Sequence, residues 1–307
     1  MSRTFAFVQV DVFTDRVFGG NQLAVFYDLQ PGALSDAEMQ AIALEMNLSE
    51  TTFVYPPTRG DAVAQVRIYT PSRELPFAGH PTVGTAWVLA NRGRLPAGQR
   101  EVALEEGIGP VPVRIEGDLA APSMVWMSHR DAEFGEPLPN RAAFAAGLHL
   151  TEADLLPDQP VRTGSTGVTF LYVPLRTPEA VDRAEPDMRA ISSAFTGERL
   201  GVFVFAPDPA RGPGRVYSRM FAGDTIGVAE DSATGSASGP LAAYVAERGI
   251  VETAQSGAID MVSLQGNKMG RPSLAHMRVQ LQDGRTSRIV VGGGVVPVFE
   301  AVLTLPS

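Results

Sequence analysis

The sequence predicts an α+β protein built from two similar domains. Its 307 residues exceed the usual size of one hydrophobic core, which favours two domains of ordinary size. Short alternating apolar segments, typical of strands, recur along the chain between a few helical patterns. Residues 74–93 in the first half also resemble residues 230–249 in the second half. Together these observations favour a strand-and-helix unit that occurs twice.

The internal repeat has an offset of 156 positions. Six identities connect the two segments, where composition alone gives about one or two. The identical pairs are Glu74 and Glu230, Gly79 and Gly235, Ala86 and Ala242, Ala90 and Ala246, Arg92 and Arg248, and Gly93 and Gly249. The alternative is a chance likeness between two Ala-rich helices that both end in Gly.

The first half gives a clear order of elements. Strand patterns cover residues 5–13, 23–27, 51–54, 63–70, 102–104 and 111–115. Ser35-Asp36-Ala37-Glu38 is a capping box, which predicts a helix that ends near Asn47. A second, apolar helix is predicted from near Pro81, which suits a first helical turn, to just before Gly93.

The second half repeats this style after a looser stretch. The pattern weakens near residues 118–122, where we place a domain boundary, and residues 131–160 are a polar connection with one or two helices. Strands are predicted near Phe170, Val202 and Val216. Residues 289–305 are the most apolar, but three consecutive glycines and a proline interrupt them, which indicates strands and a turn.

Composition excludes several functions. The net charge of -9 disfavours nucleic-acid binding, which needs a basic surface, although a small anionic substrate remains possible. The absence of cysteine excludes disulfides and thiolate chemistry. We find no nucleotide-binding glycine motif and no zinc-like histidine pair, so we expect no cofactor and no metal. Without an evident signal peptide or membrane span, the expected location is the cytoplasm.

Two small-residue turns precede the helices of the repeat. They are Ala78-Gly79-His80-Pro81 and Ala233-Thr234-Gly235-Ser236-Ala237. The first amides of a helix lack internal partners and attract anions, and small residues let a ligand approach the backbone. A single turn of this kind is more often a plain helix start. The pairing favours an anion site in a cleft, if a pseudo-twofold axis relates the two domains.

Four polar residues near these turns are candidates for acid/base chemistry or ligand binding. Glu50 stands between a helix and a strand, where burial would raise its pKa to a useful value; the alternative is a solvated loop glutamate. His80 could donate a hydrogen bond to a ligand or could simply cap its helix. Asp231 could act on a ligand or only complement the helix dipole, and Ser236 could donate to a ligand or be an ordinary first-turn serine.

Taken together, these stretches resemble the PhzF-like (phenazine-biosynthesis) family of isomerases. The motifs that support the resemblance are Asp11-Val12-Phe13, Gly20-Asn21-Gln22-Leu23-Ala24-Val25-Phe26, Met46-Asn47-Leu48-Ser49-Glu50-Thr51-Thr52-Phe53-Val54, Arg67-Ile68-Tyr69-Thr70-Pro71, Glu74 to Ala86, Arg219-Met220-Phe221, Glu230 to Ala237, Gln265-Gly266 and Gly270-Arg271-Pro272-Ser273. They span nearly the whole chain, and residues 130–215 contribute little.

The resemblance implies the diaminopimelate-epimerase-like fold, with a mixed sheet around a central helix in each domain and an interdomain cleft. Its last strand returns to the first domain, so we assign residues 1–121 and 296–307 to the N-terminal domain and 122–295 to the C-terminal domain. It also implies a possible homodimer.

By the same resemblance, Glu50 is the single acid/base that moves a proton within a small carboxylate substrate such as a dihydro-hydroxyanthranilate. His80 and Asp231 would assist it. The implied substrate-binding residues are Asn21, Gly79, Thr234, Gly235 and Ser236. An epimerase or racemase of an amino-acid-like substrate, and a non-catalytic small-molecule-binding protein, stay open as alternatives.

Overall fold

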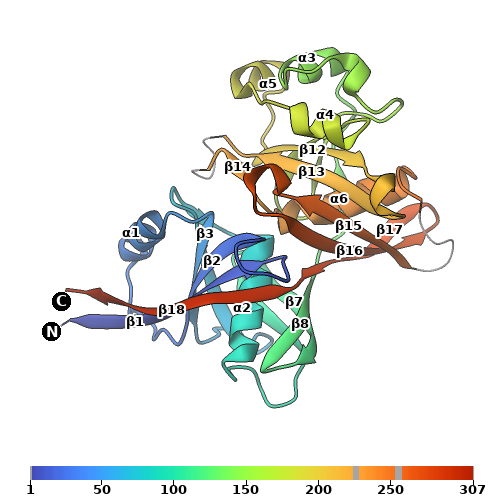
Figure 1. The fold of residues 1–307 in the computed structure, drawn as a ribbon. Coiled ribbons are helices and arrows are strands. Elements are labelled where there is room, and N and C mark those ends of the chain that lie inside the picture. The colour runs from blue at the N-terminus through green and yellow to red at the C-terminus, as the bar shows by residue number, and fades with distance from the viewer. Residues whose placement is uncertain (1, 224–227, 253–257, 307) are drawn as a thin grey trace. The chain divides into compact units, whose positions relative to one another are not determined.

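The computed structural model describes residues 2–223, 228–252 and 258–306 (Figure 1). The chain forms two compact units, Met1–Ser128 together with Gly292–Ser307, and His129–Val291. We call them unit 1 and unit 2. The second unit is therefore inserted, in sequence, before the last strand of the first.

Unit 1 is a mixed sheet. Its strands are β1 (Arg3–Val12), β2 (Asn21–Phe26), β3 (Glu50–Tyr55), β4 (Ala64–Tyr69), β5 (Glu74–Leu75), β6 (Glu101–Glu106), β7 (Gly109–Asp118), β8 (Ala121–Ser128) and β18 (Val295–Leu305). The hydrogen-bonded order is β18-β1-β2-β3-β4-β6-β7-β8, and β5 pairs with β4. Only the β2–β3 and β4–β6 pairs of these are parallel. Both parallel steps contain a helix, as a parallel connection requires.

Helix α2 (Gly79–Asn91) is the centre of unit 1. Every residue from Gly79 to Ala90 is buried, so the helix has no solvent face. It packs against β1, β2, β3, β7 and β8. Gly84 permits this close packing: a Cβ there would lie 2.6 Å from Leu23 Cδ2 and 2.8 Å from Val12 Cγ2, so both side chains would have to move. The sheet can therefore wrap closely around the helix.

Helix α1 (Asp36–Met46) covers the other face of this sheet. The predicted capping box is present, and Asn47 ends the helix in the left-handed conformation. Met39, Ile42 and Ala43 pack on a row of aromatic side chains from adjacent strands. Ring centroids in that row lie 4.7 Å apart for Phe7 and Phe26, 5.2 Å for Phe26 and Phe53, and 5.6 Å for Phe53 and Tyr69.

Unit 2 repeats the arrangement. Its strands are β9 (Glu133–Phe134), β10 (Arg162–Ser165), β11 (Thr169–Pro174), β12 (Gly201–Pro207), β13 (Arg215–Phe221), β14 (Glu230–Asp231), β15 (Ala258–Gln265), β16 (Ser273–Gln282) and most of β17 (Arg285–Gly293). The order is β9-β10-β11-β12-β13-β15-β16, and β14 pairs with β13. The β11–β12 and β13–β15 pairs are parallel.

Helix α6 (Gly235–Glu247) is the counterpart of α2 and is buried from Gly235 to Ala246. Three short helices form a second layer on the outer face of the sheet: α3 (Arg141–Ala146), α4 (Pro178–Arg183) and α5 (Met188–Ala194). Phe144, Val181 and Ile191 anchor this layer on apolar residues of β11, β12 and β13. All three helices lie within residues 130–215, the region where the sequence resemblance is weak.

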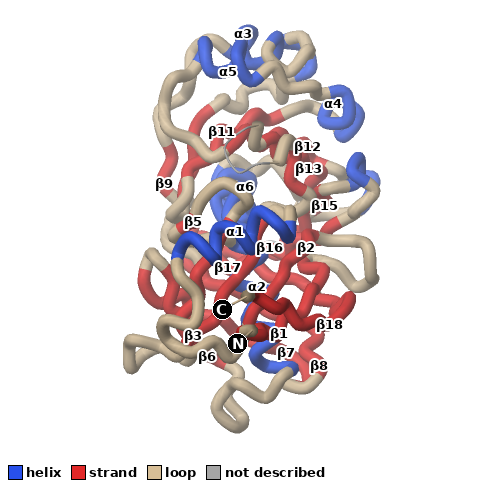
Figure 2. Tube along the Cα trace, turned by 90° about the vertical axis from the view of Figure 1, so that its left-hand side faces the viewer, coloured by secondary structure: helices blue, strands red, loops and turns tan. Residues whose placement is uncertain are grey.

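The two units share one pairing scheme. The pairs β2–β3, β3–β4, β4–β5, β4–β6 and β6–β7 match β11–β12, β12–β13, β13–β14, β13–β15 and β15–β16 in order and direction. Figure 2 shows the strands of each unit around its own long helix. The predicted class, α+β with two similar domains, is confirmed.

One sequence expectation differs from the structure in detail. The weakened pattern near residues 118–122 is the tight turn between β7 and β8, with Asp118 paired to Ala121, and both strands belong to unit 1. The chain enters unit 2 at Ser128–His129 and leaves it at Val291–Gly292. A hairpin turn loses the period-2 pattern in the same way as a linker does, so periodicity alone does not distinguish them.

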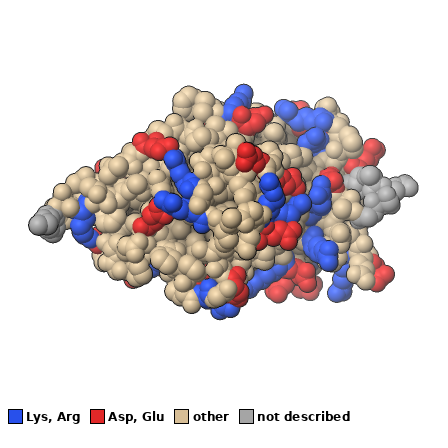
Figure 3. Space-filling model, turned by 90° about the horizontal axis from the view of Figure 1, so that it is seen from below, with Lys and Arg blue, Asp and Glu red and all other residues tan. Residues whose placement is uncertain are grey.

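The surface carries both signs of charge. On the face drawn in Figure 3, Lys and Arg side chains lie next to Asp and Glu side chains rather than in one basic field. A mixed surface of this kind gives little attraction for a polyanion. Among the described residues, no helix has the length and apolar character needed to cross a bilayer.

Candidate active site

Glu50 is the first residue of β3 and faces the central helix. Alternation along the strand places Glu50 and Thr52 on one side and Phe53 on the aromatic side toward α1. Thr52 Oγ1 lies 3.0 Å from Thr85 Oγ1 of α2, which fixes the inward side of the strand. Glu50 is only 6% exposed. This burial excludes the solvated loop glutamate that the sequence left open.

His80, the second residue of α2, lies beside Glu50. Its Nε2 is 3.4 Å from Glu50 Oε2, and its side chain is 3% exposed. Burial, the largest influence, lowers the pKa of His80 to about 3, against a smaller raising effect of a hydrogen bond to the Gln22 backbone. The ring is thus neutral at physiological pH, and the contact with Glu50 is not an ion pair.

Asn21 sets the orientation of the imidazole. Ser49 Oγ donates to Asn21 Oδ1 at 3.1 Å, which leaves the Asn21 amide nitrogen directed at His80 Nδ1, 3.2 Å away. An amide nitrogen can only donate, so Nδ1 accepts from it and the ring proton lies on Nε2. Ser49, Asn21 and His80 therefore place the protonated ring nitrogen 3.4 Å from Glu50 Oε2, a contact that lacks hydrogen-bond geometry in this structure.

The starts of the two central helices lack side-chain caps. Helices α1, α3, α4 and α5 begin with a side chain that accepts from a first-turn amide: Ser35, Asn140, Thr177 and Asp187. In the described structure, neither Ala78 before α2 nor Thr234 before α6 makes such a bond. His80 therefore does not cap its own helix. Both buried starts keep amide donors available for an anion.

The loop before α6 holds the second group of predicted residues. Thr234 is not a cap because its hydroxyl donates to Asp231 Oδ2 at 2.6 Å. Gln265, the last residue of β15, accepts from the Thr234 amide at 3.2 Å and donates to the Asp231 carbonyl at 2.8 Å. Asp231, Thr234, Gly235 and Ser236 are thereby held in one buried turn.

Gly266 lets this turn close. Its φ is +73°, and a Cβ there would lie 2.4 Å from the Arg271 carbonyl oxygen and 2.5 Å from that of Ser232. Only glycine fits both the left-handed conformation and the close approach of two backbones. The Gln265-Gly266 pair therefore shapes the Asp231 loop from a strand 30 residues downstream of Gly235.

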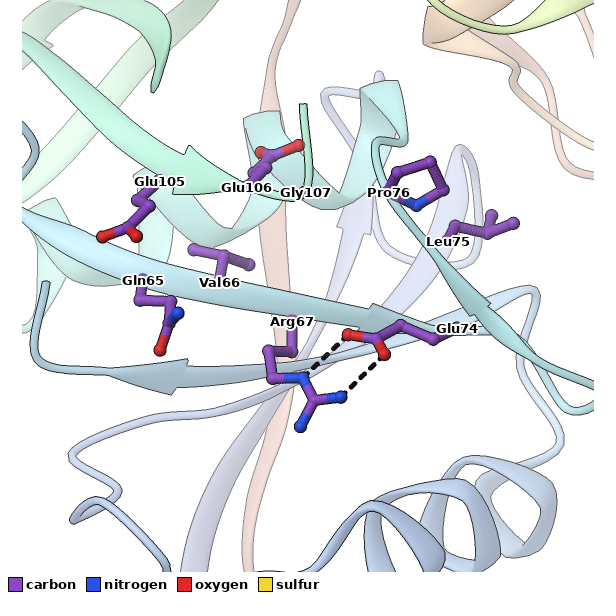
Figure 4. Close-up of a pocket in the computed structure, with 9 residues that line it drawn as sticks. All are labelled: Gln65, Val66, Arg67, Glu74, Leu75, Pro76, Glu105, Glu106 and Gly107. Atoms are coloured by element: carbon purple, nitrogen blue, oxygen red, sulfur yellow. Dashed lines mark hydrogen bonds and ion pairs between the residues drawn. The ribbon is translucent and has the colours of Figure 1, made fainter. Parts of the chain in front are cut away.

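A matched Arg–Glu pair fixes the short strand before each helix start. In unit 1, Arg67 donates twice to Glu74, at 2.7 Å each (Figure 4). In unit 2, Arg219 donates twice to Glu230, at 2.8 and 2.9 Å. The guanidinium groups lie over the rings of Tyr69 and Phe221, 5.3 and 4.6 Å from their centroids. We call these the Arg–Glu clamps.

The predicted site residues therefore form two groups. Asn21, Glu50, Gly79 and His80 lie together in unit 1, and Asp231, Thr234, Gly235 and Ser236 lie together in unit 2. Sequence reasoning missed Ser49 and Gln265, which orient these residues. Both occur in the motifs quoted above, but one sequence does not show which polar neighbour of a candidate bonds to it.

Comparisons with known proteins agree with this architecture. The chain matches the family "Phenazine biosynthesis-like protein" over residues 10–301. It is 36% identical to a trans-2,3-dihydro-3-hydroxyanthranilate isomerase of Pseudomonas chlororaphis over 97% of this chain and 99% of that protein.

Solved structures give the same result. A predicted epimerase from Pseudomonas aeruginosa is 34% identical, with a TM-score of 0.77 over 99% of this chain and 100% of that one. A phenazine biosynthesis protein of the PhzF family from Bacillus anthracis, 24% identical, has a TM-score of 0.85 over 98% of this chain and 99% of that one, which shows the shared fold. This chain therefore belongs to the phenazine biosynthesis-like, or PhzF, family.

Proposed function

We propose that this protein, an isomerase of the PhzF type, moves a proton within a small carboxylate substrate without a cofactor, and that Glu50 is its single acid/base. The observation that supports the role of Glu50 most is its burial next to a neutral imidazole, whose Nε2 lies 3.4 Å from Glu50 Oε2. A small movement that closes this contact into a hydrogen bond would favour the ionised carboxylate that is needed to accept a proton. A cationic imidazole would lower the pKa of Glu50 further and disfavour the protonated intermediate, and the neutral ring avoids this.

The proposed reaction has two steps. Glu50 removes a proton from one substrate carbon, so that a C–H bond breaks, an O–H bond forms on the glutamate, and the released electron pair shifts into the adjacent double-bond system of the substrate. It then returns the proton to another carbon on the same face, which restores the carboxylate. The atoms and electrons balance within the substrate, so no oxidant or metal is needed.

The uncapped helix starts are proposed to bind the substrate. Amides at Gly79 and at Gly235 suit a carboxylate, and Ser236 offers a hydroxyl. Asp231 and Thr234 are proposed to bind the amino group, since a buried carboxylate and hydroxyl suit a cationic donor. Asn21 is proposed to act through His80. Trans-2,3-dihydro-3-hydroxyanthranilate, named for the Pseudomonas chlororaphis relative, is the first substrate to test.

The experiment is proton exchange in deuterated water, followed by NMR of the substrate carbons. Wild type should isomerise the substrate, with deuterium at the new C–H position in those turnovers in which the proton on Glu50 exchanges with the solvent before it is returned. Glu50→Gln should slow this by about 10³-fold, the usual size of a general acid/base effect. Glu45→Gln, a conservative change of an exposed glutamate on α1, is the control and should match wild type.

Other outcomes would redirect the proposal. Exchange that persists in Glu50→Gln removes this residue from the base role. Inversion at one carbon without migration, lost in Asp231→Asn, would indicate an epimerase. Tight binding without exchange would indicate a binding protein.

We also propose that the protein is a homodimer. Phe299 and Val302 of β18 are 45% and 63% exposed, and apolar side chains of this size are common in subunit contacts. Light scattering after gel filtration should give about twice the chain mass of 32.7 kDa.

A further inference from the structure

Glu106, the last residue of β6, is a buried carboxyl group that the proposed reaction does not use. It is 6% exposed, and its neighbour in space is Thr82 in the first turn of α2. Figure 4 shows Glu105 and Glu106 pointing to opposite sides of the strand end. Glu105 receives hydrogen bonds from the amide and hydroxyl of Thr58, which lower its pKa against the effect of burial, so it is ionised.

The contacts of Thr82 determine the protonation of Glu106. Thr82 Oγ1 lies 2.7 Å from the carbonyl oxygen of Ala78 and 2.6 Å from Glu106 Oε1. A hydroxyl has one proton, and a carbonyl and a carboxylate are both only acceptors. Both short distances are satisfied together when Thr82 donates to Ala78 and Glu106 is protonated and donates to Thr82.

The surroundings of Glu106 agree with a neutral group. Burial raises the pKa of Glu106 to about 8, and the Thr82 contact lowers it by a smaller amount. The pocket beside it, about 420 Å³ in volume, is lined by charged groups from β4, β5 and β6. Arg67 provides the guanidinium group among the described lining residues, and it donates its hydrogen bonds to Glu74 and Asp36 rather than to Glu106. Glu74 and Glu105 are the other charged groups, and both have partners of their own.

The hydrogen bonds that run from Glu106 through Thr82 end on a peptide group of the candidate site. The carbonyl of Ala78 and the N–H of Gly79 belong to the same peptide, at the uncapped start of α2. A hydrogen bond to the carbonyl polarises the peptide, which makes its N–H a stronger donor. We propose that Glu106 is a positioning residue. Its protonated carboxyl donates to the Thr82 hydroxyl, which in turn donates to the Ala78 carbonyl. These two hydrogen bonds orient and polarise the Ala78–Gly79 peptide toward the substrate carboxylate. This inference rests on the proposed binding of a carboxylate at Gly79.

The arrangement makes substrate affinity depend on pH. When Glu106 loses its proton above about pH 8, the single Thr82 proton is drawn to the carboxylate and leaves the Ala78 carbonyl. KM should then rise by roughly fivefold, the size expected for one hydrogen bond, while kcat changes little.

The test is the pH dependence of KM and kcat between pH 6.5 and 9.5. Glu106→Gln keeps an N–H donor to Thr82 but cannot ionise, so its KM should stay flat where that of wild type rises. Thr82→Val removes the hydroxyl that connects Glu106 to the Ala78 carbonyl. The KM of this variant should therefore be raised at every pH and should not rise further with increasing pH. Glu105→Gln is the matched control and should keep the wild-type profile. A wild-type KM that is flat, or a Glu106→Gln profile that rises like wild type, overturns the proposal.

A second measurement does not need turnover. Calorimetric binding of anthranilate to the Glu50→Gln protein should weaken above pH 8, and this loss should be absent when Glu106→Gln is added. The infrared difference between wild type and Glu106→Gln should show a protonated carboxyl at pH 7. An ionised Glu106 at pH 7, or a pH dependence unchanged by Glu106→Gln, overturns the inference. If these effects are found but no substrate is isomerised, the positioning role stands and the proposed reaction fails.

Discussion

At the scale of single residues, Glu50 and His80 are distinguished by their contact: both are buried, and Nε2 of the imidazole lies 3.4 Å from Glu50 Oε2. Asn47 in the left-handed conformation ends α1 and turns the chain, so that β3 begins at Glu50 rather than in solvent. The motif resemblance identified Glu50 and His80 from the sequence. It could not indicate that the imidazole is neutral, because that depends on burial and on Asn21, which is 59 residues away.

The neutral state of His80 gives a prediction for stability. A histidine in the unfolded chain takes up its proton near pH 6.5, whereas His80 in the folded protein does so only near pH 3. Between these values the unfolded state binds the extra proton, so the free energy of unfolding falls as the pH is lowered from 6.5. The contribution of this group is at most about 1.4 kcal/mol per pH unit.

Denaturant unfolding of wild type and His80→Gln at pH 7 and pH 5 measures this effect. The difference in stability between them should shift in favour of His80→Gln at pH 5, because this variant lacks the His80 ring, whereas the buried His129 is present in both proteins. His149→Gln, at an exposed histidine, should follow wild type. An equal shift in all three proteins would contradict the neutral assignment.

At the scale of elements, the Arg–Glu clamps occupy equivalent places in the two units, although the sequence offset between the units changes from the arginine to the glutamate. Arg67 and Arg219 are 152 positions apart, whereas Glu74 and Glu230 are 156 apart, since the connection in unit 2 is four residues longer. The hairpin register is still the same, with Tyr69 opposite Glu74 and Phe221 opposite Glu230. The equivalence of Arg67 and Arg219 follows from this pairing.

The two clamps differ in burial, which predicts different costs of removal. The Arg219 and Glu230 side chains are 10% and 18% exposed, against 25% and 41% for Arg67 and Glu74. Arg219 also donates to the carbonyls of Val181, Asp182 and Ala184 at the end of α4. Arg219→Ala should therefore destabilise by about 3–5 kcal/mol, because it leaves a half-buried carboxylate and several carbonyls without their donor.

Arg67→Ala is the internal comparison and should cost only about 1 kcal/mol, as expected of a more exposed ion pair. Thermal unfolding of both variants, with calorimetry to confirm cooperative transitions, gives the comparison. Equal losses at the two positions would show that burial of the clamp has no influence on its contribution.

The elements themselves were predictable to different degrees. The capping box at Ser35 and the Gly93 helix end follow local rules, and the structure confirms both. Helices α3, α4 and α5 were less defined, because each has only six or seven residues and too few turns to show a periodic pattern. Their positions depend on tertiary packing against β11, β12 and β13, which is not encoded in local spacing.

At the scale of the whole molecule, β18 connects the two ends of the chain within unit 1. It pairs with β1 in ten registered positions from Arg3 with Leu305 to Val12 with Val295. Phe5 and Phe7 of β1 are buried in the aromatic core, so loss of the neighbouring strand would expose them. The sequence repeat alone could not show this return of the chain, because β18 lies outside the repeated segments.

Removal of residues 292–307 should therefore unfold unit 1 rather than trim its edge. We expect rapid proteolysis of residues 1–128, loss of their protected amides in hydrogen exchange, and no catalytic exchange of substrate. Removal of residues 306–307 alone leaves every β1–β18 pair and should have no effect. A stable, protease-resistant unit 1 in the longer truncation would show that β18 is dispensable.

The insertion of one unit inside the other also has a consequence for synthesis on the ribosome. Unit 2 is complete once residue 291 has emerged, whereas unit 1, which was begun first, lacks β18 until residues 292–307 are made. The segment that contains Glu50 and His80 must therefore wait, with β1 open on one side, while the whole of unit 2 is translated. A nascent chain that stalls just before residue 292 would contain every proposed catalytic side chain and still be inactive.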